Sequence, residues 1–110
     1  MRKKLEGLDL ILPEPAVNSN PSWFGFLITV KFGRDRIVRH LESRGIQTRM
    51  LFAGNLTKQP CCNEMELIGG KLYNTDIIMN NTFWVGVYPG ITKKHIDYMV
   101  KEIGKVVGKI

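Results

Sequence analysis

Three short strand-like blocks that alternate with helix-spaced stretches constrain this chain more than any other feature. The blocks cover residues 23–30, 46–52 and 83–88, and the first is rich in aromatic and branched side chains. Short blocks of this kind are typical of strands in a sheet. Because a segment with helical spacing follows each block, the order is β-α-β-α-β-α. We predict an α+β fold in which helices cover one face of a three-stranded sheet.

The predicted helices have recognisable ends. Residues 34–44 have helical spacing, and Gly45 follows them as a helix-terminating glycine. The run 74–76 (Asn-Thr-Asp) offers N-cap chemistry for a short helix. Thr92 caps the last helix, and the apolar positions of that helix form one stripe. The stripe consists of Ile96, Met99, Val100, Ile103 and Val107.

Length and composition place the chain among ordinary globular proteins. Its 110 residues predict a single domain, 1–110, and 44% hydrophobic and 24% charged residues are usual values. No apolar run approaches the ~20 residues that span a bilayer. The basic start is not followed by the apolar core of a signal peptide. We therefore expect a cytoplasmic protein without membrane contact.

The net charge of +6 raises the alternative of a small basic nucleic-acid-binding protein. The basic residues are scattered, however, and aromatic residues are not interleaved with them as a stacking platform requires. Lys94, Lys101 and Lys105 fall between the apolar positions of the last helix, which is the pattern of a solvated face. Nucleic-acid binding is the weaker alternative.

The segment 46–60 carries the candidate binding residues, because it predicts a short strand that runs directly into a turn. The strand delivers Arg49, whose planar guanidinium suits carboxylate or phosphate oxygens. The turn presents Gly54, which permits close backbone approach, and Asn55, which can donate and accept hydrogen bonds. From the residues alone, Arg49 has two interpretations: a surface arginine paired with a carboxylate of its own domain, or a ligand-binding arginine.

Other side chains that could carry chemistry have simpler interpretations. His40 and His95 have no serine, cysteine or carboxylate at the spacing of a catalytic pair, so we expect exposed helix histidines. The adjacent Cys61 and Cys62 indicate neither a disulfide framework nor, alone, a metal site, since structural sites take four spaced ligands. We predict no metal site.

The aromatic residues of the strands could form a sugar-stacking platform, but their apolar surroundings favour a place in the core. They are Trp23, Phe24, Phe26, Phe83 and Trp84. Strand alternation predicts that Trp23 and Gly25 point to one face, and Phe24, Phe26 and Ile28 to the other. Helices of this chain can cover one face, so we expect the opposite face to be an apolar surface without a partner.

Three sequence blocks carry a resemblance to a known family. They are PSWFGFLITV at 21–30, GIQTRMLFAGNLTKQP at 45–60 and NTDIIMNNTFWVGVYPGIT at 74–92. In this order they resemble the CDP-4-keto-6-deoxyglucose 3-dehydrases of the DegT/DnrJ/EryC1/StrS group of vitamin B6-dependent sugar aminotransferases and dehydratases, some of which are lipopolysaccharide biosynthesis proteins. The resemblance extends from about residue 5 to about residue 104. It concerns only the C-terminal small domain of a longer fold-type I enzyme.

The resemblance implies a fragment that closes the active-site cleft of a nucleotide-sugar 3-dehydrase or an allied aminotransferase. Arg49 and Asn55 would contact substrate, and Gly54 would serve the turn. No residue of this chain would be catalytic, because the base and the site for pyridoxal or pyridoxamine phosphate lie in the family's large domain. Some relatives also carry a two-iron two-sulfur cluster, whose cysteines lie upstream of this region.

The partners that the resemblance implies are the large domain, a nucleotide-linked 4-keto-6-deoxy sugar and further copies in a homo-oligomer. One departure from the family is plain: relatives tend to have an aromatic residue after Gln59-Pro60, and this chain has Cys61-Cys62. A stand-alone, non-catalytic binding or regulatory module derived from the same domain stays open as an alternative.

Overall fold

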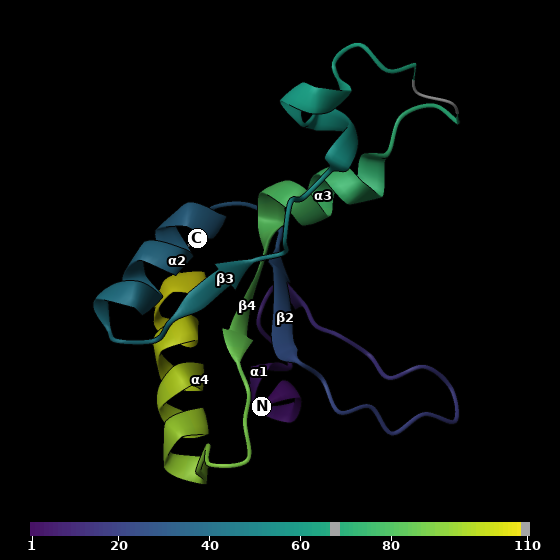
Figure 1. The fold of residues 1–110 in the computed structure, drawn as a ribbon. Helices are drawn as coiled ribbons and strands as arrows, with labels where there is room; N and C mark the ends of the chain where they lie inside the picture. The colour runs from purple at the N-terminus through teal and green to yellow at the C-terminus, as the bar shows by residue number, and fades with distance from the viewer. Residues whose placement is uncertain (67–68, 109–110) are drawn as a thin grey trace.

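An antiparallel sheet of four strands forms the centre of the computed structural model, which describes residues 1–66 and 69–108. The strands lie in the order β1 (Leu10–Ile11), β2 (Gly25–Val30), β4 (Thr82–Gly86) and β3 (Thr48–Met50). Figure 1 shows β4 between β2 and β3. The α+β class is confirmed.

The edge strand β1 is an addition to the three strands that the sequence predicts. Leu10 pairs with Val30 and Ile11 with Thr29, so two residues suffice to extend the sheet. The strand ends there because Pro13, and then Pro15, cannot donate backbone hydrogen bonds to a ladder.

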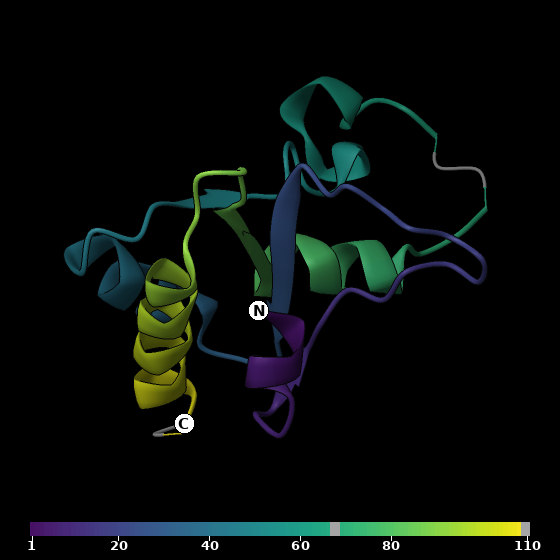
Figure 2. The ribbon, with the colours of Figure 1, turned by 90° about the horizontal axis from the view of Figure 1, so that it is seen from below.

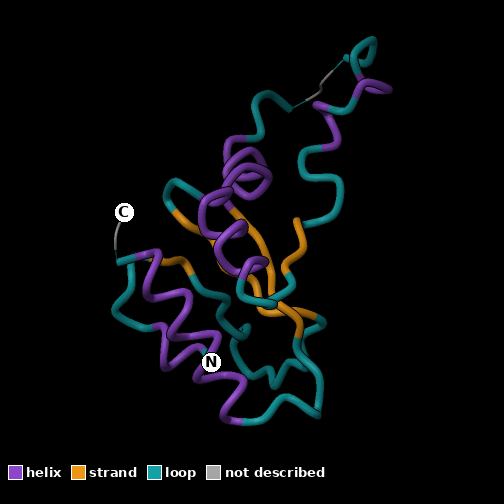
Figure 3. The backbone as a smooth tube through the Cα atoms, turned by 90° about the vertical axis from the view of Figure 1, so that its left-hand side faces the viewer, coloured by secondary structure: helices purple, strands orange, loops and turns teal. Residues whose placement is uncertain are grey.

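Three helices cover one face of the sheet, and the fourth lies at its end (Figures 1 and 2). The covering helices are α1 (Arg2–Leu5), α2 (Arg34–Ser43) and α4 (Lys93–Val107), and α2 packs along α4 (Figure 3). The end of the sheet carries α3 (Tyr73–Asn81) and two short 3₁₀ helices, η1 (Leu56–Lys58) and η2 (Pro60–Cys62). Within the described ranges, no helix is long and apolar enough to cross a bilayer.

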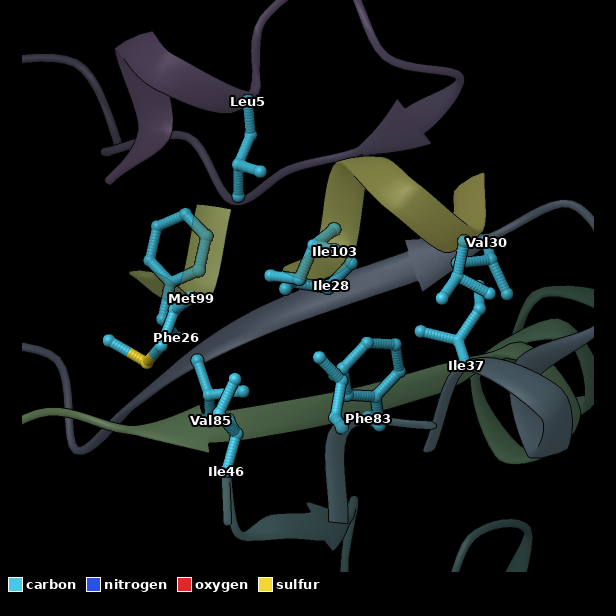
Figure 4. Close-up of a cluster of buried hydrophobic side chains, with 12 residues drawn as sticks. Leu5, Phe26, Ile28, Val30, Ile37, Ile46, Phe83, Val85, Met99 and Ile103 are labelled. Carbon is cyan, nitrogen blue, oxygen red and sulfur yellow. The ribbon is translucent and has the colours of Figure 1, made fainter. Parts of the chain in front are cut away.

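The core lies between the sheet and the covering helices. Alternate residues of β2 and β4 point into it, and they meet apolar side chains of all three helices (Figure 4). The buried cluster comprises Leu5, Phe26, Ile28, Val30, Ile37, Leu41, Ile46, Phe83, Val85, Met99, Ile103 and Val106. The predicted stripe of α4 is confirmed, because its five members are buried or packed against this cluster.

Two predicted helix ends are confirmed by backbone geometry. After α2, Gly45 adopts φ +74, its N–H donates to the Glu42 carbonyl, and the Ile46 N–H donates to the Leu41 carbonyl. These two bonds form a Schellman motif, which satisfies carbonyls that the helix end leaves unpaired. At α4, the Thr92 hydroxyl accepts from the His95 N–H, and His95 Nδ1 accepts from the Thr92 N–H.

The predicted cap of α3 is wrong. The helix begins at Tyr73, and no side chain caps it at Leu72. Asp76, which the sequence placed in the N-cap run, instead contacts the turn before η1. The Asp76 carboxylate therefore forms tertiary contacts with Asn55 and Lys58 and does not cap its own helix.

The expected alternation also fails upstream of Gly25. The Trp23 ring lies 6.1 Å from Phe26 on the core side, whereas the Phe24 ring lies 4.8 Å from Trp84 on the other side. The strand begins only at Gly25, so the twofold alternation of a strand does not apply to the two residues before it.

Candidate functional site

The sheet face opposite the helices is only partly covered, and we call it the open face. It carries Gly25, Leu27 and Thr29 of β2, none of which is buried, whereas Phe26, Ile28 and Val30 are buried. Trp84 of β4 lies on this face too, because its neighbours Phe83 and Val85 point into the core. The apolar second face that the sequence predicts is therefore present.

Three aromatic side chains, Phe24, Phe52 and Trp84, form what we call the aromatic cluster on the open face. The ring of Trp84 lies between the other two, with centroids 4.8 Å from Phe24 and 6.3 Å from Phe52. Phe24 is 79% exposed and Phe52 is 81% exposed. The core interpretation is thus confirmed for Phe26 and Phe83 and wrong for Phe24 and Trp84, while the half-buried Trp23 packs against the core.

The Trp84 ring is held in a defined position. Its Nε1 donates to the Met50 carbonyl at 3.1 Å, which ties β4 to the end of β3. The ring lies against Gly25, where an added Cβ would come 1.6 Å from Trp84 Cε3. A glycine at this position is therefore what allows the indole to lie flat on the sheet.

Phe52 occupies an unusual backbone position. Its φ is +47, a left-handed conformation that bulky residues rarely adopt. The preceding strand is shorter than predicted: β3 ends at Met50 instead of continuing to Phe52, and the Phe52 N–H donates back to the Met50 carbonyl at 2.9 Å. This turn brings an exposed ring to 6.3 Å from Trp84 at some cost in backbone strain.

Arg49 lies beside the aromatic cluster. It is the direct cross-strand partner of Trp84, so both side chains project from the open face. The Arg49 side chain is exposed, and it forms no ion pair with any carboxylate in residues 1–66 and 69–108. The interpretation as an arginine paired within its own domain is not supported by this geometry.

The Glu42 carboxylate is near enough to Arg49 to feel its charge, but its hydrogen bonds are with Thr48. Glu42 Oε1 accepts from the Thr48 N–H at 2.6 Å and from its hydroxyl at 2.7 Å. These two hydrogen bonds, more than the charge of Arg49, lower the pKa of Glu42 below its usual range. The contact fixes the start of β3 to the end of α2, so it positions Arg49 indirectly.

Asn55 is buried, with 2% of the residue exposed, and it contacts α3 through Asp76. Its Oδ1 accepts from the N–H and the hydroxyl of Thr57, at 3.1 and 2.7 Å, which caps η1. Its Nδ2 donates to Asp76 Oδ1 at 2.8 Å, and Lys58 also contacts that oxygen at 2.9 Å. The Asn55 hydrogen bond, followed by that of Lys58, lowers the pKa of Asp76.

Gly54 serves the turn, as predicted. It adopts φ +67, and an added Cβ would come 2.4 Å from Met79 Cγ of α3. Both the backbone conformation and the close approach of α3 require glycine here. The predicted site residues therefore separate: Arg49 projects from the open face, while Gly54 and Asn55 join the following turn to α3.

The sequence missed one cluster of charged side chains entirely. His40 was expected to be an exposed helix histidine, but it is half-buried, and its Nε2 lies 2.9 Å from Glu102 Oε2, between α2 and α4. Glu102 is 3% exposed and also contacts Lys105 at 2.5 Å and Arg44 at 3.6 Å. The Lys105 hydrogen bond is the main cause that lowers the pKa of Glu102. His95 is exposed, as expected.

The hollow on the open face suits an apolar partner better than a cofactor. Its volume is about 230 Å³, and all of its lining residues are apolar: Trp23, Phe24, Gly25, Leu27, Leu51, Phe52 and Trp84. A vitamin B6 cofactor needs donors for its phosphate and an acidic partner for its ring nitrogen, so it does not fit this lining. In the described residues, no cluster of His, Cys, Asp or Glu is arranged to hold a metal ion.

Comparison with known proteins identifies relatives for nearly the whole chain. It is 48% identical over 115 aligned residues to the dTDP-4-dehydro-2,6-dideoxy-D-glucose 3-dehydratase of Saccharopolyspora spinosa. This alignment covers 99% of this chain and 25% of that protein. It is 48% identical over 104 residues to the lipopolysaccharide biosynthesis protein RfbH of Salmonella typhimurium, covering 90% of this chain and 24% of that protein. The chain thus spans about a quarter of the length of these relatives.

Solved structures share the fold. A DegT DnrJ EryC1 StrS aminotransferase from Brucella abortus matches 97% of this chain and 28% of its own, with a TM-score of 0.85 and 17% identity. The E. coli GDP-4-keto-6-deoxy-D-mannose-3-dehydratase, solved with bound hydrated PLP, matches 92% of this chain and 27% of its own, with a TM-score of 0.79 and 23% identity.

A family model matches residues 1–104, and its description is the DegT/DnrJ/EryC1/StrS aminotransferase family. The sheet, α1, α2, the three sequence blocks and all but the last residues of α4 lie within the matched region. This chain belongs to the DegT/DnrJ/EryC1/StrS aminotransferase family.

Proposed function

We propose that this chain is the C-terminal small domain of a nucleotide-sugar 3-dehydrase that uses pyridoxamine or pyridoxal phosphate. In this role it packs against a large cofactor-binding domain, in the same or a separate chain, and closes the active-site cleft. The enzyme would act on a nucleotide-linked 4-keto-6-deoxy sugar in deoxysugar and lipopolysaccharide synthesis. Support comes from two relatives at 48% identity, one a sugar 3-dehydratase and the other a lipopolysaccharide biosynthesis protein.

The observation that carries the proposal is the open face with its exposed aromatic cluster. Burying an aromatic or aliphatic side chain contributes about 1.5–3 kcal/mol, whereas an exposed ion pair contributes about 0.2–1 kcal/mol. Phe24 and Phe52 would therefore supply most of the attraction to a partner domain. Arg49, at the margin of the same face, would supply an anion contact at the closed cleft.

The three predicted site residues take different roles in this proposal. Arg49 is the residue that we expect to contact an anionic group of the substrate. Asn55 is buried, and its contacts to Thr57 and Asp76 hold the turn, so it would reach substrate only through its second Nδ2 hydrogen. Gly54 permits the turn to approach α3. The homo-oligomer and the cytoplasmic location stay predictions.

Exchange of domains tests the proposal. The quarter of the Saccharopolyspora spinosa enzyme that matches this chain would be replaced by this chain, and the chimera assayed for 3-dehydratase turnover. We expect activity, with loss on Arg49→Ala. A charged hydrogen bond is worth roughly 1.5–3 kcal/mol, which corresponds to a loss of about tenfold or more in turnover. Arg49→Lys should restore little, because the fork geometry is lost.

Two results would contradict this assignment. Activity of the Arg49→Ala chimera within a factor of about two of the parent would remove Arg49 from the site. The second measurement uses this chain alone, for which we expect self-association that is relieved by the isolated large domain. A monomer with no affinity for that domain in sedimentation experiments would favour the stand-alone module instead.

A further inference from the structure

Two adjacent thiols stand outside every role assigned so far. Cys61 and Cys62 are both free, and their Sγ atoms lie 3.8 Å apart in η2. Cys61 is exposed and Cys62 is half-buried. They stand directly after Gln59-Pro60, in a part of the chain to which the proposed function gives no role.

The backbone around the pair forms a closed turn that holds the two sulfurs together. The Cys62 N–H donates to the Gln59 carbonyl at 2.9 Å, and the Met65 N–H donates to the Cys62 carbonyl at 3.0 Å. Gln59 Nε2 in turn donates to the Ala53 carbonyl at 2.8 Å. Pro60 at the start of η2 fixes one further backbone angle.

The two sulfurs differ in their readiness to react. The hydrogen bond with Cys61, followed by burial, raises the pKa of the Cys62 thiol above its usual value. Cys62 is therefore harder to deprotonate than an ordinary thiol. Cys61 presents an exposed sulfur to solvent, and a thiolate at an accessible position is what attacks a disulfide.

We propose that Cys61 and Cys62 form a reversible modification site that exchanges with low-molecular-weight disulfides. Cys61 is the attacking sulfur and Cys62 the resolving one. This inference is independent of the proposed function, because it involves neither the open face nor a large domain. The chemical class of the co-reactant is a small, soluble disulfide such as oxidised glutathione.

The exchange proceeds in two displacements. The Cys61 thiolate attacks one sulfur of the small disulfide, so that a mixed disulfide forms and one small thiolate leaves. Cys62 then loses its proton to solvent and attacks Cys61 Sγ, which forms the Cys61–Cys62 bond and expels the second small thiolate. The two leaving thiolates take up protons from solvent. The protein is oxidised by two electrons, and the small disulfide is reduced to two thiols.

The product would be strained and therefore easy to reduce. Adjacent Cα atoms lie about 3.8 Å apart across a trans peptide, whereas disulfides usually join Cα atoms about 4.4–6.8 Å apart. Bringing the sulfurs from 3.8 Å to bonding distance must change the backbone of η2 and disturb the Cys62–Gln59 hydrogen bond. Strained, exposed disulfides are the labile ones.

The test treats the reduced 110-residue chain with oxidised glutathione and follows intact mass. We expect the mass to fall by two hydrogens without a lasting adduct, and dithiothreitol to reverse the change. Peptide mapping should place the bond between residues 61 and 62. Cys62→Ser should stop at a glutathione adduct on Cys61, and Cys61→Ser should react about tenfold more slowly. The double variant, Cys61→Ser with Cys62→Ser, is the matched control and should not change in mass.

Specific results would overturn the proposal. A stable glutathione adduct on the unmodified sequence, or a disulfide-linked dimer as the main product, would show that Cys62 does not resolve. No reaction of the unmodified sequence under conditions that modify Cys62→Ser would show that Cys61 does not attack when Cys62 is beside it, which would also overturn the proposal. Equal rates for the two single variants would overturn the assignment of Cys61 as the attacking sulfur. Amide hydrogen exchange supplies a second readout: oxidation should speed exchange at the Cys62 N–H.

Discussion

Both faces of the sheet carry side chains in defined positions, but helices of this chain cover only one of the two faces. On the covered face, Phe83 and Ile28 are fully buried against helices of the same chain. On the open face, Trp84 is positioned by a hydrogen bond and by Gly25, yet the rings beside it are mostly exposed. Order on the open face therefore does not depend on burial. The open face is oriented before any partner arrives, which lowers the ordering cost of association.

The largest expected effect lies on the covered face. Phe83→Ala removes a fully buried ring from the centre of the core, and such changes cost about 3–5 kcal/mol. Denaturant unfolding of the chain would measure this loss. If Phe83→Ala cost no more than a surface substitution, the covered face would not be the source of stability.

The next effect concerns the charged contact that joins α2 to α4. Glu102→Gln should destabilise the chain at neutral pH, because His40, Arg44 and Lys105 would lose a buried carboxylate. The folded-state pKa of Glu102 is lowered, so its contribution is present above the unfolded pKa of about 4.3 and is lost as the pH falls through the folded value.

Thermal melts as a function of pH test this sign. The difference between the parent and Glu102→Gln should be widest near neutral pH and should narrow below about pH 4. Glu6→Gln is a suitable control, since Glu6, directly after α1, is exposed and its one ion pair in the described residues, with Arg2, is open to solvent. A difference that grew toward acid pH would contradict the assignment.

A smaller loss of stability is expected from a substitution in the turn before η1, which contains Asn55. Asn55→Ala removes the cap of η1 and leaves Asp76 with one contact fewer, for a cost of about 1–2 kcal/mol. Because the turn lies away from the core, hydrogen exchange should rise mainly in the segment 53–63 and in α3. Uniform loss of protection over α2 and α4 would show that the turn is not a separate region.

The smallest effect on stability is expected in the aromatic cluster. Phe52→Ala removes a ring that is 81% exposed and leaves the core packing unchanged. The free energy of unfolding should therefore change by no more than about 0.5 kcal/mol. Association should respond instead: the variant should self-associate less and bind the large domain more weakly. If Phe52→Ala instead lowered the free energy of unfolding strongly and left association unchanged, the open face would serve stability and not binding.

Sequence reasoning succeeded where neighbours along the chain decide the structure. Gly45, the Thr92 cap and the α4 stripe depend on residues within one or two turns, and all three are confirmed. The position of Arg49 next to the turn followed from the same local pattern. Its role in binding stays a prediction.

The misses share a different cause. Glu102 and His40 come into contact only because α2 and α4 pack together. Asp76 does not cap α3 and instead accepts a hydrogen bond from Asn55. Such pairs are far apart in the sequence, and no local pattern marks them. Phe24 was misplaced because the strand begins at Gly25 and not at Trp23, and the alternation of a strand does not apply to residues before it.

The central position of β4 has a consequence for how the chain reaches its native state. β4 pairs with both β2 and β3, yet it is the last strand along the sequence. The sheet cannot be completed until residues 82–86 have left the ribosome, because until then β3 has no partner strand and β2 can pair only with β1. Such long-range pairing slows folding and leaves intermediates prone to aggregate. Nascent chains that end before residue 82 should therefore be strong chaperone substrates.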